Sequence, residues 1–168
     1  MKLNLSFFIV ATIIAMASCL QSIKDNHSNE QQDFGSSFLG KWQSVERGIP
    51  YKAMLSVNAD GSFSFDYGAC TVSGFSLGTW ILEDDILILN SLPADTCLFV
   101  REFGEDCYTI EQLEGFKLQT TITDCKPEDL DEFVSFQNVK FQLIGDTLKH
   151  LFPGERICPE IRNDFFRP

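Results

Sequence analysis

Few residues of this chain have the chemistry and the spacing of a catalytic site. Cys158 and His150 could form a nucleophile–base pair, because an imidazole beside a thiol activates it, but no third orienting group accompanies them. His150 alternates with Leu148 and Phe152, a pattern typical of one strand face, where a lone His is commonly a core or rim residue. The phosphate-loop and HExxH motifs are absent from the sequence. We therefore predict that the protein is not an enzyme.

No residue pattern predicts a metal ion or a cofactor. Asn58-Ala59-Asp60-Gly61 has the composition of part of a calcium loop, but Ser56 and Tyr67 stand where that loop needs Asp and Glu. The acidic residues of Glu128–Glu132 could hold a cation, although such a cluster is more typical of a solvated loop. We interpret the first segment as a hairpin turn and the second as a surface loop.

The N-terminal residues have the layout of a secretory signal peptide. Lys2 supplies a positive charge, and the apolar run Phe7–Ala17 is too short for a comfortable membrane span. Met16-Ala17-Ser18-Cys19 resembles the lipobox of bacterial lipoproteins, in which the signal is removed and the cysteine is acylated, palmitate being one such chain. The resemblance implies a signal peptide over residues 1–18 and a lipidated Cys19 that anchors the chain in the membrane.

The composition divides the mature chain into a tether and one domain. Residues 19–37 contain the lipidated Cys and a polar flexible tether, and residues 38–168 are long enough for one domain with its own core. Leu20 follows the anchor where Asp would signal inner-membrane retention, so the resemblance indicates the outer membrane of the cell envelope. The net charge of −11 argues against nucleic acid as a partner.

Five further cysteines are expected to meet an oxidising compartment, where disulfides form. They are Cys70, Cys97, Cys107, Cys125 and Cys158. If strands alternate in direction from Lys41, the first two lie at one end of the fold and the other three at the opposite end. A disulfide reaches only about 4.4–6.8 Å between Cα atoms, so bonds between the ends are excluded. We predict Cys70–Cys97 and Cys107–Cys125, although any two of the last three satisfy the same rule.

From Phe38 onward, apolar and polar residues alternate between turn residues, which is typical of β-hairpins. Four hairpins are expected, over residues 51–67, 75–89, 108–123 and 139–152. Only Pro127–Phe133 has signals of a helical turn. Hairpins with one apolar face must cover that face, and closure also removes exposed edges. We predict an all-β antiparallel up-and-down meander closed into a barrel of eight to ten strands, with a two-sheet sandwich as the competitor.

A series of short motifs follows this hairpin pattern. Gly40-Lys41-Trp42 opens the first strand, and the series continues with Leu55–Phe63, Gly78-Thr79-Trp80, Asp85–Leu89 and Tyr108–Leu113. The order resembles the lipocalin-like lipoproteins of Bacteroidetes, and the resemblance covers Phe38 to Thr120. It implies a lipocalin-like barrel with a Trp that closes one end and, by analogy, an apolar pocket. The cysteines and the hairpin Val139–Phe152 lie outside the pattern.

Aromatic side chains on the expected strands are candidates for lining that pocket, because small barrels hold apolar ligands among inward side chains. The candidate ligand-binding residues are Trp42, Phe63, Phe65, Tyr67, Phe75, Trp80 and Phe141, with Leu77 and Leu118 beside them. The same rings could instead fill the barrel as its core. The sequence thus predicts a membrane-anchored lipoprotein that binds a small hydrophobic ligand in the cell envelope.

The alternative is a non-catalytic protein-interaction module, either an accessory subunit of an envelope complex or an inhibitor. Its working surface would be the loop Asp124–Glu132 and the tail Pro153–Pro168. The tail carries Arg156, Arg162 and Arg167, a basic exception in an acidic chain, and Arg is favoured at interfaces.

Overall fold

The computed structural model describes residues 35–46, 50–104, 118–153 and 161–168. Phe38–Pro168 make up one compact unit, in which the described regular elements are β-strands. These are β1 (Gly40–Ser44), β2 (Tyr51–Val57), β3 (Ser62–Ala69), β4 (Val72–Glu83), β5 (Ile86–Ser91), β6 (Phe99–Glu102), β7 (Gln119–Thr120), β8 (Glu132–Ser135), β9 (Val139–Ile144), β10 (Thr147–His150) and β11 (Phe165–Phe166). In the described part of the chain, no helix has the length and apolar character needed to span a bilayer.

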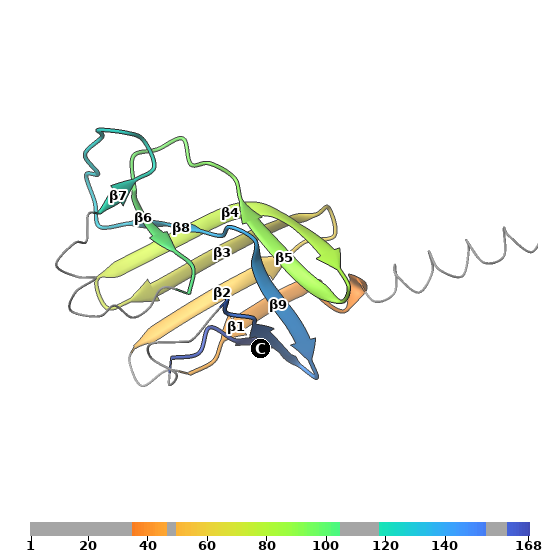
Figure 1. Cartoon of the computed structure of the whole chain (residues 1–168). Coiled ribbons are helices and arrows are strands. Elements are labelled where there is room, and N and C mark those ends of the chain that lie inside the picture. The colour runs from red at the N-terminus through yellow and green to blue at the C-terminus, as the bar shows by residue number, and fades with distance from the viewer. Residues whose placement is uncertain (1–34, 47–49, 105–117, 154–160) are drawn as a thin grey trace, which may run out of the picture. The chain divides into compact units, whose positions relative to one another are not determined.

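Eight strands close into an antiparallel barrel (Figure 1). Around the wall their order is β1, β2, β3, β4, β5, β9, β10 and β11. β11 completes the circle, because Phe166 pairs with Gln43 of β1 and Phe165 pairs with Leu148 of β10. The predicted all-β closed barrel is therefore confirmed, and the last residues of the chain are part of its wall.

Three of the expected hairpins are present as β2–β3, β4–β5 and β9–β10. At the first turn, the Asp60 carboxylate accepts a hydrogen bond from the Ser62 backbone N–H at 2.9 Å. The β4–β5 turn uses Asp84 and Asp85 with φ of 46° and 64°, the left-handed conformation of a two-residue hairpin loop. The expected third hairpin, over residues 108–123, falls mainly outside the described residues. Its described part contains the short strand β7.

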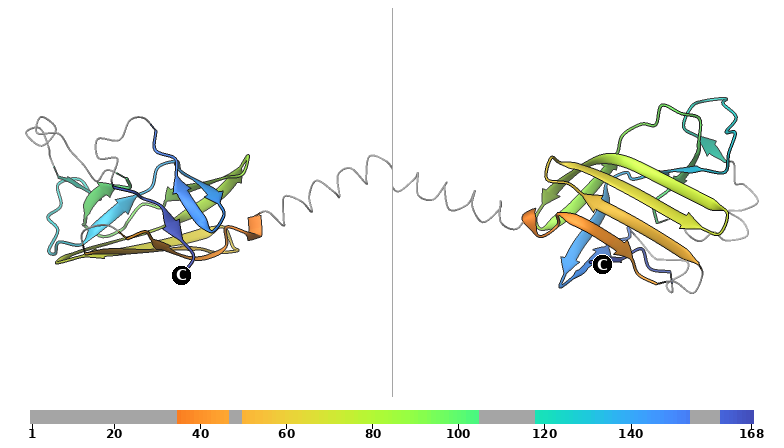
Figure 2. Two further views of the ribbon diagram at one scale, coloured as in Figure 1. Left: turned by 90° about the horizontal axis from the view of Figure 1, so that it is seen from below. Right: turned by 180° about the vertical axis from the view of Figure 1, so that it is seen from behind.

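The chain leaves the barrel wall between β5 and β9, and we call the described residues between these two strands, which include β6, β7 and β8, the insertion. β8 runs parallel to β4, with Gly74 opposite Glu132, and parallel to β6, with Phe99 opposite Glu132. Figure 2 shows β6 and β8 on the same side of the β1–β4 sheet as β9 and β10. The fold is therefore not a pure meander. The expected helical turn over Pro127–Phe133 was wrong, since Phe133 is buried in β8.

The disulfide pairing also departs from the prediction. Cys97 bonds to Cys125 with a Cα–Cα distance of 6.0 Å, and Cys70 is a free, exposed thiol at the β3–β4 turn. The predicted pairs Cys70–Cys97 and Cys107–Cys125 were therefore wrong. The rule behind them assumed that every strand runs up or down the wall, whereas the insertion reverses that order through its parallel pairings. Cys107 and Cys158 lie outside the described residues.

Large aromatic residues fill the barrel, and β4 makes room for them with small residues. Its inward positions are Gly74, Ser76 and Gly78, all buried. A Cβ atom added to Gly78 would overlap the ring of Phe63, and one added to Gly74 would overlap the ring of Tyr67. Because successive side chains of a strand point to opposite faces, the apolar residues between these positions lie outside the barrel.

Candidate functional site

A shallow hollow opens at the end of the barrel where β6 crosses beside β2 and β3. Its lining residues are Tyr51, Phe65, Tyr67, Arg101, Glu102, Phe103, Gly104, Val134 and Asn163. Tyr51 and Tyr67 reach this end because Tyr51 pairs with Ala69 and Ala53 pairs with Tyr67. Their rings stack with centroids 5.5 Å apart. The four aromatic side chains give the hollow an apolar wall, and Arg101, Glu102 and Asn163 supply polar groups.

A hydrogen-bonded network joins the insertion to the barrel at this hollow. The Tyr67 hydroxyl donates to the Glu132 carboxylate, and Arg101 Nη1 lies 3.5 Å from the same carboxylate. Glu132 reaches Arg101 because β8 lies beside β6. It reaches Tyr67 because Gly74 of β4 pairs with Glu132 on one side and with Tyr67 on the other. Burial raises the pKa of the Tyr67 phenol, and the hydrogen bond to Glu132 and the charge of that carboxylate raise it further. Tyr67 therefore stays protonated and remains a donor at physiological pH.

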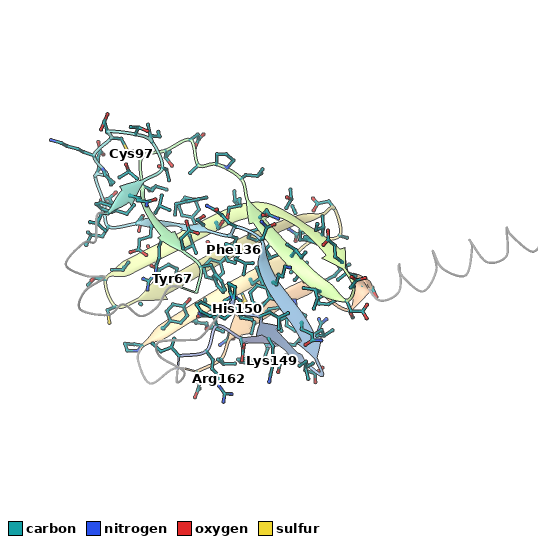
Figure 3. The ribbon with its side chains drawn as sticks, in the orientation of Figure 1. Tyr67, Cys97, Phe136, Lys149, His150 and Arg162 are labelled. Atoms are coloured by element: carbon teal, nitrogen blue, oxygen red, sulfur yellow. A yellow bond between two sulfur atoms is a disulfide. The ribbon has the colours of Figure 1, made fainter. Side chains whose placement is uncertain are left out.

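Two rings from the insertion occupy the interior of the barrel behind the hollow. Phe103, just after β6, stacks on Phe136, just after β8, with centroids 4.4 Å apart. Phe103 also packs edge-on against Phe65 at 5.7 Å and His150 at 5.2 Å. Figure 3 shows Phe136 and His150 between the strands of the wall and Cys97 out in the insertion.

Gly104 allows the chain to turn away immediately after Phe103. Its φ of +89° belongs to the region that favours glycine, and a Cβ atom there would lie 2.8 Å from His150 Cε1. The backbone of the insertion therefore passes directly against the ring of His150. This close approach positions Phe103 within the aromatic interior.

The remaining space is small. The cavity volume of the hollow is about 20 Å³, which is room for about one water. The wider empty space at its mouth measures about 270 Å³ and includes open solvent. Pockets for drug-sized ligands usually measure about 300–1,000 Å³. A bound molecule would therefore contact the mouth of the barrel, since side chains fill its centre.

The structure brings two of the seven predicted ligand-binding residues, Phe65 and Tyr67, to this hollow. Phe63 and Phe141 are fully buried in the core. Phe75 lies on the outer face of β4, and so does Leu77, while Leu118 is exposed in the insertion. Their expected inward orientation was wrong: the small residues of β4 take its inward positions, and Leu118 lies outside the eight strands of the barrel wall.

Trp42 and Trp80 lie at the end of the barrel away from the hollow. Trp42 pairs with Leu55, toward the end of β2, whereas Tyr51 begins that strand. The buried indole of Trp42 donates to the Phe38 carbonyl at 2.8 Å, and the Arg167 guanidinium lies 4.3 Å from its ring centre. Trp80 donates from Nε1 to the Asn58 carbonyl at 2.8 Å. Both indoles therefore stabilise the end of the barrel that contains the β2–β3 turn.

Sequence patterns did not indicate Arg101, Glu102, Phe103 or Asn163. β6 is only four residues long, too short for alternation to stand out, and its partner β8 is far away in the sequence. The available signal was the short run Leu98–Phe103, in which β-forming apolar residues surround one Arg–Glu pair.

Part of the described tail belongs to the barrel wall. Asn163, Asp164 and Phe165 are buried, and the Asp164 carboxylate accepts the His150 backbone N–H at 3.0 Å. Arg167 is held over Trp42, and Arg162 is exposed. The expected role of the tail as an interaction surface therefore stays a prediction that rests on its exposed arginines, and Arg156 lies outside the described residues.

The acidic loop shows no metal-binding arrangement. Glu128, Asp129 and Asp131 are exposed, and the Asp131 carboxylate accepts a hydrogen bond from the Ser73 hydroxyl. Among the described residues, no group of three or more His, Cys, Asp or Glu side chains is placed to hold a metal ion.

The fold and the site together define a closed eight-stranded β-barrel with an aromatic, partly polar hollow at one end. Comparisons with protein-family models, with curated proteins and with solved structures give no match to this chain.

Proposed function

We propose that this chain is a lipid-anchored lipoprotein of the bacterial cell envelope whose lipocalin-like barrel binds a small, partly apolar molecule. The observation that carries the proposal is the hollow at the barrel mouth, where four aromatic side chains lie beside the Arg101–Glu132 ion pair. An apolar wall with a few fixed polar groups is the usual composition of a small-molecule site. The proposed role is binding without chemical transformation.

The size and polarity of the hollow restrict the ligand. Phe103 and Phe136 occupy the barrel centre, so a long apolar chain has no space there. A small molecule could place an apolar part against Tyr51 and Tyr67 and a polar group toward Arg101. Arg101 is suited to anionic groups, because guanidinium recognises carboxylates and phosphates with paired donors.

The anchor is proposed from the N-terminal sequence. The lipobox-like residues before Cys19 predict removal of residues 1–18 and acylation of Cys19, with palmitate among the chains. The expected location is the outer membrane, with residues 19–37 as a tether. Lipid attachment through several chains would make this anchoring stable.

Native mass spectrometry of the full chain purified from its host tests the binding proposal. We expect an excess mass that leaves on denaturation and is recovered in an organic extract. Arg101→Gln should lower the liganded fraction, whereas Arg162→Gln, a change at an exposed arginine outside the hollow, should leave it unchanged. A bare mass for the wild-type chain, or equal loss in both variants, would contradict binding at this hollow.

A further inference from the structure

Four exposed apolar side chains on the outside of the barrel form what we call the β4 stripe. Phe75, Leu77 and Ile81 lie on the outer face of β4 and are 37%, 58% and 50% exposed. Leu92 lies beside Leu77, because its backbone N–H donates to the Leu77 carbonyl at 2.9 Å, and it is 54% exposed. The stripe therefore runs along β4 and onto the segment that follows β5.

The stripe reverses the usual polarity of a barrel strand, which places apolar residues inward and polar residues outward. Gly74, Ser76 and Gly78 point inward, and the Ser76 hydroxyl satisfies its polarity by a 2.7 Å contact with the Ser91 hydroxyl. The apolar residues of the stripe therefore add little to the core. Exposed large apolar side chains gathered on one strand face, here with Thr79 between Leu77 and Ile81, typically mark an interaction site.

Neighbouring side chains leave the stripe uncovered. On β3, the residues opposite Leu77 and Phe75 are Ser64 and Asp66. Both side chains are short, and neither can extend over the apolar groups of β4. The apolar groups therefore stand above the adjacent strand and are accessible to a partner.

The residues next to the stripe on β3 and at the β4–β5 turn carry negative charge, and the nearest lysines, Lys52 and Lys140, lie two strands away on β2 and β9. Between Lys52 and Arg101 the chain has six carboxylates and no Lys, Arg or His. Asp66 pairs across from Phe75, and exposed carboxylates at Glu83, Asp84 and Asp85 follow Ile81. Complementary charge around an apolar centre selects partners and accelerates their association.

We propose that the β4 stripe is a docking surface for another protein, through a segment that presents apolar side chains flanked by Lys or Arg. The apolar side chains would cover the stripe, and the cations would pair with the surrounding carboxylates. Anionic lipid is disfavoured by the same carboxylates. A symmetric contact between two copies of the stripe is also disfavoured, because it would place like charges opposite one another. This surface is independent of the ligand proposed at the barrel mouth.

Short synthetic peptides test the proposal with the purified full chain. One peptide alternates Lys with Leu, a second alternates Glu with Leu, and a third alternates Lys with Ser. We expect only the Lys–Leu peptide to bind, as measured by fluorescence anisotropy, with affinity that falls at high salt. The double variant Leu77→Ser/Ile81→Ser should weaken binding at least about ten-fold, since both side chains contribute apolar contact area.

Two further variants make the test specific. Asp66→Asn/Glu83→Gln should weaken binding of the Lys–Leu peptide and reduce its salt dependence. Ile144→Ser removes an equally exposed isoleucine from β9 and should change nothing. Failure of the Lys–Leu peptide to bind, equal binding of the Glu–Leu peptide, or unchanged binding to Leu77→Ser/Ile81→Ser would overturn the proposal. Sedimentation that shows the wild-type chain, but not Leu77→Ser/Ile81→Ser, associating with itself would assign the stripe to a second copy.

Discussion

At the scale of single residues, Tyr67 links the barrel, the insertion and the hollow. Its ring packs beside Phe65 and Tyr51, and its hydroxyl donates to Glu132, which also pairs with Arg101. One phenol thus fixes the carboxylate that orients the polar side of the proposed ligand site. The hydrogen bond from Tyr67 to Glu132 should contribute more to the free energy of unfolding than an ordinary hydrogen bond, because its acceptor is charged.

Tyr67→Phe should lower the free energy of unfolding by about 1–3 kcal/mol, since the partly buried Glu132 carboxylate loses its phenol donor and keeps only the longer contact with Arg101. Urea denaturation of the full chain measures this change. An unchanged midpoint would show that the Tyr67–Glu132 contact does not support the insertion.

The raised pKa of Tyr67 gives this contact a pH dependence with a definite sign. A group with a folded pKa above its unfolded value of 10.0 contributes its full stability below pH 10 and loses it as pH rises further. Wild-type stability should therefore fall more steeply above pH 10 than that of Tyr67→Phe. Parallel slopes in denaturation series across this range would contradict the assigned contact.

Among the elements, β4 determines the packing inside the barrel wall near the hollow and the exposed apolar surface outside it. Its small inward residues receive the rings of β3, and its large outward residues form the β4 stripe. The strand is also the one that pairs with β3, β5 and β8. A change in its inward volume should therefore disturb the packing of the aromatic core.

Gly78→Ala should lower the free energy of unfolding by about 1–3 kcal/mol, because the added methyl group overlaps the Phe63 ring and a backbone carbonyl. Gly68→Ala is the matched control on β3, where nothing lies within 4 Å of an added Cβ atom. Thermal or urea unfolding compares the two variants. Equal stability of both would contradict the close packing of β3 against β4.

The Cys97–Cys125 disulfide and the free Cys70 thiol lead to a specific expectation for thiol reactivity. Without reductant, Cys70 should react with iodoacetamide in the native chain, whereas Cys97 and Cys125 should react only after reduction. Cys97→Ser should also lower stability by about 3 kcal/mol, since the bond closes a long loop. Peptide mass mapping that finds Cys70 blocked and Cys97 alkylated would contradict the pairing.

The local signals in the sequence were sufficient for the hairpins but not for the insertion. The turns at Asp60-Gly61 and Asp84-Asp85 act between adjacent strands, so β2–β3 and β4–β5 could be predicted from nearby residues. The pairing of Glu132 with Gly74 joins residues far apart in the chain, and no local pattern encodes it. The orientation of β4 was also ambiguous, because its glycines give no apolar signal for the inward face. Phe75 was therefore assigned to the wrong side, and Arg101 was missed.

At the scale of the whole molecule, charge is distributed unevenly over the barrel. The stretch from β3 to β5 is free of cations, whereas Lys41, Lys140 and Lys149 are exposed on β1, β9 and β10. The proposed ligand site lies at one end of the barrel and the β4 stripe on its side. The two proposed binding functions could therefore operate together, since they use different residues.

The proposed anchor predicts a covalent lipid on the whole molecule. Cys19→Ser should abolish the added mass of the acyl chains, because it removes the sulfur that carries them. Cys70→Ser is the matched control, since it removes a cysteine that forms no disulfide in the structure. Intact-mass spectrometry of the chain purified from host membranes measures both, and an acyl mass that persists in Cys19→Ser would contradict the anchor.

A crystal structure of the full chain, purified from its host with its bound material retained, tests ligand binding at the hollow most directly. We expect density for a small molecule at the barrel mouth, between Tyr51, Tyr67 and Arg101, with Phe103 and Phe136 still inside the barrel. Density in the barrel centre with these two rings displaced, or an empty mouth in a chain that carries no ligand mass, would contradict it.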